Sequence, residues 1–184
     1  MVFPIPFPEQ LCSGTVLLRP LTDEDWRLEY ELSRVPDVPQ WTYYPSNLDE
    51  LGARRRISLA RERRRDRLAA RYAIVVDDDA VGTAGMGWND RGEPEVFYAL
   101  QPAGRGRGAA TVSVQLLIAW LFEHGFPSVA LETVAGNIAS ERVAERAGFQ
   151  QTGSYTGLQR GDSVQVMRWQ KNQPCPGKVS VVFR

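Results

Sequence analysis

A short loop rich in glycine and arginine is the part of this sequence best suited to bind a charged ligand. The loop from Gly104 to Gly108 reads GRGRG; it follows a predicted strand and opens a predicted helix. Glycine lets backbone N–H groups approach a ligand closely, and a helix start supplies unpaired N–H donors with a partial positive charge. Arg105 and Arg107 add full charges that can pair with phosphate. This pattern favours a di- or triphosphorylated ligand, although glycine loops between strands and helices are common.

Two familiar nucleotide-binding motifs do not match this loop. A P-loop would end in Gly-Lys-Ser/Thr, and that ending is absent. A Rossmann fingerprint needs a parallel strand–helix series, whereas the strand before this loop belongs to a predicted antiparallel set. The one histidine, His124, has no neighbours that support a catalytic triad or a multi-histidine metal site.

The elements that position the loop follow from hydrophobic periodicity and from helix and turn signals. A strand–helix–strand unit over 93–134 requires a parallel crossover, whereas the tight turns elsewhere indicate antiparallel pairs. The sequence therefore predicts an α+β protein with a mixed sheet. The expected strands cover 15–20, 72–76, 80–88, 93–101, 129–134, 149–155 and 163–169; the expected helices cover 22–35, 48–70, 109–124 and 137–146, with a loop over 35–45.

Bulk composition narrows the class of protein. The chain has 184 residues, 43% of them hydrophobic, which suits one domain. Lys plus Arg and Asp plus Glu both total 22, so no general attraction to nucleic acid or anionic membrane is expected. No signal peptide or membrane span is recognised, which favours a soluble, cytoplasmic protein. Cys12 and Cys175 are expected as reduced thiols, with a disulfide left open.

A family resemblance adds to this interpretation. Residues 95–153 contain, in order, a strand ending in Leu-x-Pro, the Arg-Gly-Arg-Gly loop, and Asn-x-x-Ser followed by Ala-Gly-Phe. This segment resembles the core of the GNAT N-acetyltransferases, in particular the branch that includes the ribosomal-protein N-terminal (alanine/serine) acetyltransferases. Upstream, GTVLLRPLTDEDW and AVGTAGM resemble further parts of the family. We therefore expect an acyltransferase domain over 14–170, an N-terminal extension over 1–13 and a tail over 171–184.

The resemblance implies a fold and a cofactor. The fold would be a mixed central sheet of about six to seven strands, splayed in the middle and flanked by about four helices. The cofactor would be acetyl-CoA, used as a co-substrate, with no metal. The residues implied to hold it are Leu100 and Gln101 for the pantetheine arm, the amides of Arg105, Gly106, Arg107, Gly108 and Ala109 for the pyrophosphate, and Asn137 and Ser140 beside the arm.

Two residues are candidates for proton transfer. Glu95 shares a strand face with Phe97 and Ala99 and matches a frequent family glutamate, so it is a candidate general base. The alternative is a solvent-facing glutamate at a strand edge. Ser140 is a candidate donor to the leaving thiolate, and the alternative is that it caps a helix or positions CoA. Asn137 can equally be a helix N-cap.

The sequence also departs from the family pattern. Ala103 replaces an anchoring Gln or Arg, Ala144 replaces a tyrosine that serves many relatives as the general acid, and Phe97 replaces a glycine. These changes leave open a catalytically silent CoA-binding protein.

The expected function is transfer of an acetyl group to a primary amine, either a protein N-terminus or a small amine. Trp41, Tyr43 and Tyr44 are candidates for the acceptor-pocket wall, or alternatively cover the core. The arginine-dense helix 48–70 is expected as a solvated face, with a nucleic-acid-binding module as the less favoured alternative. A homodimer is possible by analogy with this branch.

Overall fold

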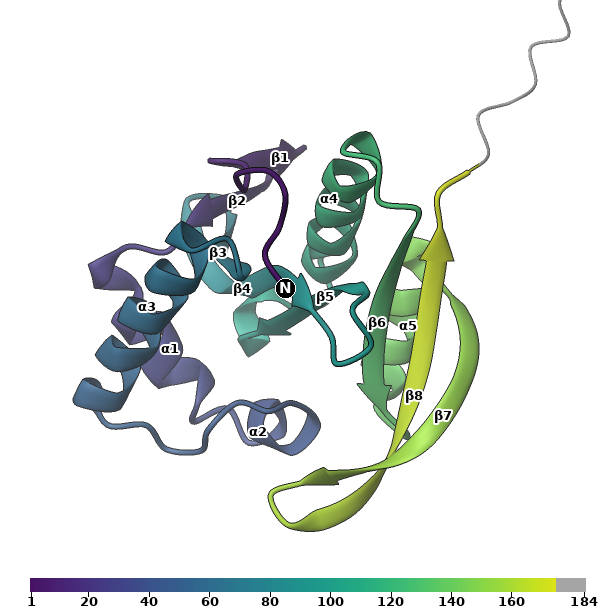
Figure 1. Cartoon of the computed structure of the whole chain (residues 1–184). Coiled ribbons are helices and arrows are strands. Elements are labelled where there is room, and N and C mark those ends of the chain that lie inside the picture. Colours follow the sequence, from purple (N-terminus) through teal and green to yellow (C-terminus); the bar gives the residue numbers. More distant parts are fainter. Residues whose placement is uncertain (175–184) are drawn as a thin grey trace, which may run out of the picture.

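The structure is a computed structural model that describes residues 1–174. Its helices and strands follow one another along the chain in nearly the predicted order (Figure 1). The strands are β1 (Leu11–Ser13), β2 (Val16–Pro20), β3 (Ala69–Val76), β4 (Asp79–Trp88), β5 (Pro94–Leu100), β6 (Ser128–Val134), β7 (Gln150–Gln159) and β8 (Asp162–Asn172). The α-helices are α1 (Trp26–Leu32), α2 (Asp37–Trp41), α3 (Glu50–Arg65), α4 (Ala109–Glu123) and α5 (Ile138–Ala147). Two short 3₁₀ helices cover Asp23–Asp25 and Pro102–Gly104.

The eight strands within residues 1–174 form one sheet, in the order β1-β2-β3-β4-β5-β6-β8-β7. Every neighbouring pair is antiparallel except β5 and β6, which are parallel as the crossover through α4 requires. These two strands pair at a single position, Glu95 opposite Ala130, whereas β4 and β5 stay paired from Trp88 to Gly82. The sheet therefore splays between β5 and β6, which confirms the predicted opening.

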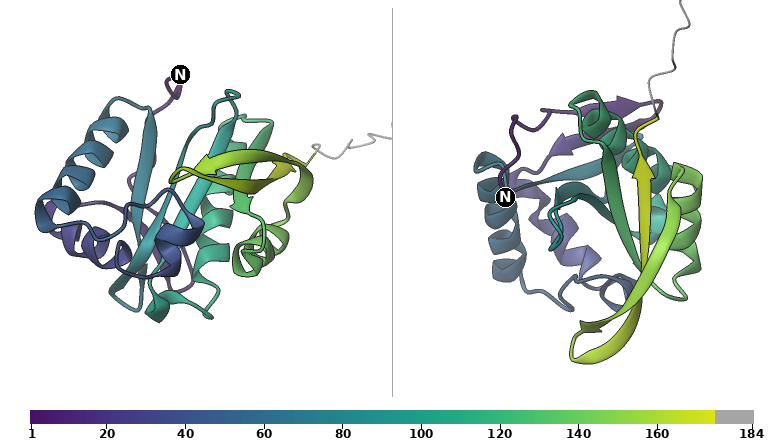
Figure 2. Two further views of the ribbon diagram at one scale, coloured as in Figure 1. Left: turned by 90° about the horizontal axis from the view of Figure 1, so that it is seen from below. Right: turned by 45° about the vertical axis from the view of Figure 1, so that its right-hand side comes forward.

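Helices cover both faces of the sheet (Figure 2). One buried cluster packs α4 and α5 against the sheet and includes Leu117, Leu121 and Ala144. A second cluster packs α1 and α3 against the other face and includes Leu32 and Ile57. Successive side chains along each strand point to opposite faces of the sheet, so each strand contributes to both buried clusters. For the same reason, neighbouring side chains of β5 lie on different faces.

The part of the chain that the structure describes contains one strand and one α-helix more than predicted. The added strand, β1, lies in the segment expected as an N-terminal extension, and Phe3 and Phe7 of the same segment are buried in the core. The added helix, α2, occupies the region expected to be a loop over 35–45. The predicted domain limits stay a prediction, and Cys175, with the possible disulfide to Cys12, lies outside the described residues.

The arginine-dense helix ends earlier than predicted. Its pattern predicts a helix to residue 70, but α3 ends at Arg65 and β3 begins at Ala69. Arg67 takes a left-handed conformation with φ 57°, and the N–H of Leu68 bonds the carbonyl of Arg63. This is the hydrogen-bond pattern of a helix C-terminus closed by a left-handed residue. Over residues 1–174, no helix has the length and apolar character needed to cross a membrane.

Candidate active site

The glycine loop presents unpaired backbone donors at the start of α4. Gly106 and Gly108 have φ of 76° and 78°, and a Cβ at either position would meet nothing within 4 Å. Within residues 1–174, the amides of Gly106, Arg107 and Gly108 have no hydrogen-bond acceptor, and the first α4 amides, including that of Ala109, lack helical partners by geometry. The open side of the loop therefore fits a pyrophosphate, as acetyl-CoA would require.

The two loop arginines are engaged in ion pairs in this structure. Arg105 forms a bidentate pair with Asp37 of α2, at 2.7 and 2.9 Å, and also donates to the carbonyl of Leu100 at 3.0 Å. Arg107 pairs with Asp77 in the β3–β4 turn. The Arg105 guanidinium holds the pKa of the Asp37 carboxyl below its usual range. The loop thus offers its backbone directly, whereas its side chains would have to exchange partners to reach phosphate.

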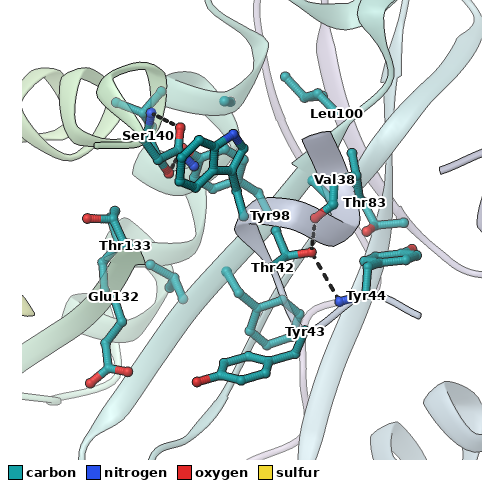
Figure 3. Close-up of a pocket in the computed structure, with 18 of the residues that line it drawn as sticks. Val38, Thr42, Tyr43, Tyr44, Thr83, Tyr98, Leu100, Glu132, Thr133 and Ser140 are labelled. Atoms are coloured by element: carbon teal, nitrogen blue, oxygen red, sulfur yellow. Dashed lines mark hydrogen bonds between the residues drawn. The ribbon is translucent and has the colours of Figure 1, made fainter. Parts of the chain in front are cut away.

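The beginning of α5 faces the opening of the sheet. The Asn137 side chain accepts from the Ser140 N–H at 3.2 Å, so the N-cap role is present. Ser140 Oγ lies 2.7 Å from the hydroxyl of Tyr98 on β5 (Figure 3). Burial raises the pKa of Tyr98 to about 12. Two hydroxyl groups therefore meet where β5 and β6 diverge, and both can be protonated at neutral pH.

Tyr98 was not among the residues predicted from the sequence. The family resemblance implies a tyrosine at the position of Ala144, and Ala144 is fully buried against the core. The structure instead brings a tyrosine from β5 to the serine. Strand alternation could have indicated Tyr98. It places Tyr98 on the face of β5 opposite to Glu95, which is the face that packs against α4 and α5.

Glu95 lies where the two strands begin to separate, on the same face of β5 as Ala99, which packs with α1, α2 and α3 in the second buried cluster. Burial raises its pKa to about 7, and the negative charge of Glu132 on β6 acts in the same direction. The side chain lines a cavity of about 800 Å³. These observations favour a partly buried carboxylate over the solvent-facing alternative, and a pKa near neutrality suits a general base.

Glu132 is a second acidic group that the prediction omitted. Its carboxylate accepts from the Tyr155 hydroxyl at 2.9 Å and lies 3.7 Å from Arg168. It is the only charged residue in the strand sequence SVALETV, and a lone charge in such a strand is a signal of function. With Glu95, it makes the β5–β6 side of the cavity acidic.

The three predicted aromatic residues all line the cavity, but they differ in burial. Tyr43 is 74% exposed, with its hydroxyl on the side of Glu132 (Figure 3). Tyr44 is only 6% exposed and packs against the guanidinium groups of Arg56 and Arg71. Burial raises the pKa of Tyr44 far above its usual range. Trp41 and Tyr43 are therefore the better placed of the three to contact an acceptor, whereas Tyr44 also belongs to the core.

The turn between β7 and β8 holds this aromatic segment in place. Gln159 is buried, and its Nε2 donates to the carbonyls of Pro39, Gln40 and Thr42 at 3.3, 3.1 and 2.7 Å. The neighbouring Arg160 binds the hydroxyl of Ser46 and the carbonyl of Tyr44. These bonds cap the C-terminal end of α2, whose other end is tied to the glycine loop by Arg105.

Most of the predicted site residues lie around this one cavity. Gln101 and Arg107 are the two that do not line it: Gln101 bonds Glu31 through its side chain and Val81 through its N–H. Phe97, at the position where the family resemblance implies glycine, lines the wall and stacks under Arg71. Ala103 is exposed in the short 3₁₀ helix before the loop. The predicted residues in the cavity lining are Trp41, Tyr43, Tyr44, Glu95, Leu100, Arg105, Gly106, Gly108, Ala109, Asn137 and Ser140.

Solved structures share this architecture at low sequence identity. RimL, a ribosomal L7/L12 alpha-N-protein acetyltransferase in complex with coenzyme A, has a TM-score of 0.79 and 18% identity, over 89% of this chain and 98% of that one. A Salmonella typhimurium acetyl transferase that modifies the N-terminal serine of L7/L12 has a TM-score of 0.77 and 18% identity, over 88% and 97%. The microcin C7 self immunity acetyltransferase MccE, in complex with acetyl-CoA and AMP, has a TM-score of 0.79 and 16% identity, over 88% and 94%.

These similarities concern the fold, and the family follows from the sequence itself. No curated protein sequence matches the chain. The family model described as an acetyltransferase (GNAT) domain matches residues 15–150, which is most of the chain. The protein therefore belongs to the GNAT family of acetyl-CoA-dependent acyltransferases.

Proposed function

We propose that this protein transfers an acetyl group from acetyl-CoA to a primary amine by direct attack of the amine on the thioester. The observation that carries the proposal is the arrangement at the opening of the sheet. Glu95, with a pKa of about 7, lies on one side, and the Tyr98–Ser140 hydroxyl pair lies on the other. Base and acid thus approach the same gap from opposite faces of β5.

Each side has a separate task in this reaction. Acetyl-CoA supplies an activated acyl group, and the loop amides of Gly106 to Ala109 hold its pyrophosphate. An amine is largely protonated at neutral pH, so Glu95 accepts its proton, directly or through a water molecule. Tyr98 and Ser140 supply a proton to the sulfur that leaves. The aromatic segment at Trp41 and Tyr43 holds the acceptor close to the thioester. Because the thioester is already activated, proximity and orientation of the amine are the main requirements of the reaction.

The relatives support an amine acceptor without fixing which one. RimL and the Salmonella protein modify the N-terminus of a ribosomal protein, whereas MccE is a self immunity enzyme. Most arginines of α3 are engaged within the protein: Arg54 with Glu50, Arg56 with Glu29, Arg61 with Asp23, Arg64 with Glu9 and Arg65 with Asp66. This pairing favours the solvated helix face over a nucleic-acid-binding module. A cytoplasmic location and a homodimer stay predictions.

The test combines binding with turnover. Calorimetric titration with acetyl-CoA should show micromolar binding by the wild-type protein. In Gly106→Trp the indole would project into the open side of the loop, so binding should be lost. Thiol release is then measured with a panel of peptides and small amines. Binding and acceptor-dependent thiol release support the proposal; binding without turnover of any amine would identify a silent CoA-binding protein, and no binding would overturn the cofactor site.

A further inference from the structure

The cavity extends beyond Glu95 to a second wall made by α3 and β3. Arg56, Leu59, Ala60 and Arg63 line it from α3, at the i, i+3, i+4, i+7 spacing of one helix face. Arg71 of β3 joins them. The small side chain at position 60 leaves space between the two helix arginines. This wall is not used by the proposed acetyl-transfer chemistry.

The second wall carries excess positive charge. Arg56 and Arg71 share one carboxylate, that of Glu29, at 2.7 and 3.2 Å. Arg63 has no carboxylate partner within residues 1–174. Three guanidinium groups therefore accompany one carboxylate, and the excess faces the cavity. Arg55, the other α3 arginine without a described ion pair, does not line the cavity.

An open strip of sheet surface at Gly87 joins this wall to Glu95. The strand register places Ala69, Gly87 and Glu95 in one row across β3, β4 and β5, and Arg71, Gly85 and Phe97 in the next row on the same face, where the Phe97 ring covers Gly85. A Cβ at Gly87 would meet only Ala69 Cβ at 3.4 Å and a more distant carbonyl. Because Gly87 also lines the cavity, the row forms a trough from Glu95 towards α3.

The two sides of the trough carry opposite charge. Glu95 and Glu132 line the cavity from β5 and β6, and Arg56, Arg63 and Arg71 line it from α3 and β3. Strands β5 and β3, which carry Glu95 and Arg71, are two strand spacings apart, which is about 10 Å across the sheet. An extended peptide advances about 3.3 to 3.6 Å per residue. An amine beside Glu95 is therefore two or three peptide residues from the arginine wall.

We propose that the acceptor is the N-terminal amine of a peptide chain with a carboxylate at its second or third residue. This inference rests on the proposed acetyltransferase function and names the substrate class of that same site. The amine lies at the acidic side of the trough, and the carboxylate pairs with Arg63 and with the excess charge of Arg56 and Arg71. Guanidinium groups suit this role because they bind carboxylates in a fixed geometry.

The test compares matched acceptors. Pentapeptide amides Ser-Ala-Glu-Ala-Ala and Ser-Ala-Gln-Ala-Ala differ by one charge, and the tripeptide Ser-Ala-Ala is used as the free acid and as the amide. For the wild-type protein, kcat/KM should be about tenfold higher for the acidic member of at least one pair. Preference in the pentapeptide pair points to a protein N-terminus, whereas preference confined to the tripeptide pair points to a short free peptide.

Variants connect the preference to the wall. Arg63→Gln should reduce the ratio of kcat/KM for the acidic and the neutral peptide about threefold. Arg63→Glu should reverse the charge preference, so that a peptide with lysine in place of the glutamate is acetylated faster than the acidic peptide. Arg55→Gln makes the same charge change on the outer side of α3 and should leave the ratio unchanged. Higher salt should also lower the ratio, because the interaction is between partly exposed charges.

The outcomes separate this inference from the function it rests on. Turnover of all four acceptors at equal rates would overturn the inference and keep the acetyltransferase. An acidic preference that survives both Arg63 variants would also overturn it, because the selectivity would then come from elsewhere. Absence of turnover with every amine would contradict the proposed function instead.

Discussion

The hydroxyl oxygens of Tyr98 and Ser140 lie 2.7 Å apart, joining β5 to the first turn of α5. These two elements lie on either side of the opening in the sheet, so the pair lies beside the path that a pantetheine arm would take. Because burial raises the pKa of Tyr98 to about 12, its hydroxyl remains a proton donor at any physiological pH. In the proposed mechanism, this pair takes the place of the tyrosine that the family resemblance implies at position 144.

The first prediction concerns proton delivery by this pair. Tyr98→Phe and Ser140→Ala should each lower kcat about 10- to 100-fold, which is at or below the lower limit of the range for general acid catalysis. Two groups that act as a unit give non-additive losses, so the double variant should resemble the slower single variant. Steady-state kinetics measure kcat, and calorimetry measures the Kd for acetyl-CoA. An unchanged kcat with a raised Kd in Ser140→Ala would leave this serine only a capping or positioning role.

The second prediction concerns the pH dependence of the reaction. With a Glu95 pKa of about 7, kcat/KM should rise through pH 7 as this carboxyl loses its proton. Glu95→Gln should lower kcat about 10²- to 10⁴-fold and remove this limb of the profile, since the amide cannot accept the proton. Rates measured from pH 5.5 to 9 test both statements. Near-wild-type activity in Glu95→Gln would remove Glu95 from the mechanism.

The same carboxyl gives a third prediction, about stability. Its folded-state pKa of about 7 lies above the ordinary value of 4.5, so between these values the folded protein holds the proton that the unfolded chain releases. The contribution of Glu95 to stability therefore falls as pH rises from 4.5 to 7. Glu95→Gln should stabilise the protein at pH 8 by about 1 to 3 kcal/mol relative to its effect at pH 4. Urea unfolding at the two pH values checks the sign, and a larger gain at pH 4 would contradict it.

The sequence supports prediction of the elements that have strong local signals. The glycine loop, the apolar helix α4 and the parallel crossover follow from turn residues, periodicity and connection rules. Helix α3 ends at Arg65, earlier than the predicted residue 70. A glycine after the helix would have indicated this end, but the left-handed residue here is Arg67, and arginine gives no such signal. Helix α2 was missed because its five residues contain a proline and show no periodic pattern.

The site was predictable as a set of positions but not as a set of contacts. Glu95 and Ser140 were identified, and both line the cavity. The partner of Ser140 and the second acidic group, Glu132, come from other strands, and only the sheet order brings them near. The pairing of Arg105 with Asp37 was also unpredictable, because it joins residues 68 positions apart.

The fourth prediction tests how the aromatic segment is held. Gln159→Ala removes one buried donor shared by three carbonyl groups and should lower the free energy of unfolding by about 1 to 3 kcal/mol. Because α2 then loses its C-terminal cap, the acceptor KM should rise about tenfold, while the Kd for acetyl-CoA stays within twofold. Leu158→Ala is the matched control, since Leu158 is adjacent and 71% exposed. Equal effects of the two variants on KM would show that Gln159 does not position the segment.

The fifth prediction concerns Glu29, which is 1% exposed and pairs with Arg56 and Arg71. Burial disfavours its ionised form, but the charges of Arg71 and Arg56 outweigh this effect and lower its pKa. Glu29→Gln leaves two guanidinium groups without a counter-charge, so it should destabilise the protein by about 3 to 5 kcal/mol at pH 7. A carboxyl with a lowered folded-state pKa stabilises above its unfolded pKa, and this contribution is lost as pH falls through the folded value.

The difference between wild-type and Glu29→Gln should therefore shrink as pH falls below about 4.5, the ordinary value of a glutamate. Urea unfolding at pH 7, 5 and 3.5 measures it, with the exposed Glu62→Gln on α3 as the control for loss of one charge. A difference that does not change with pH would mean that Glu29 stabilises by packing alone. In that case the guanidinium groups of Arg56 and Arg71 would not depend on its charge, and the wall that they form would be held by Tyr44 and Phe97.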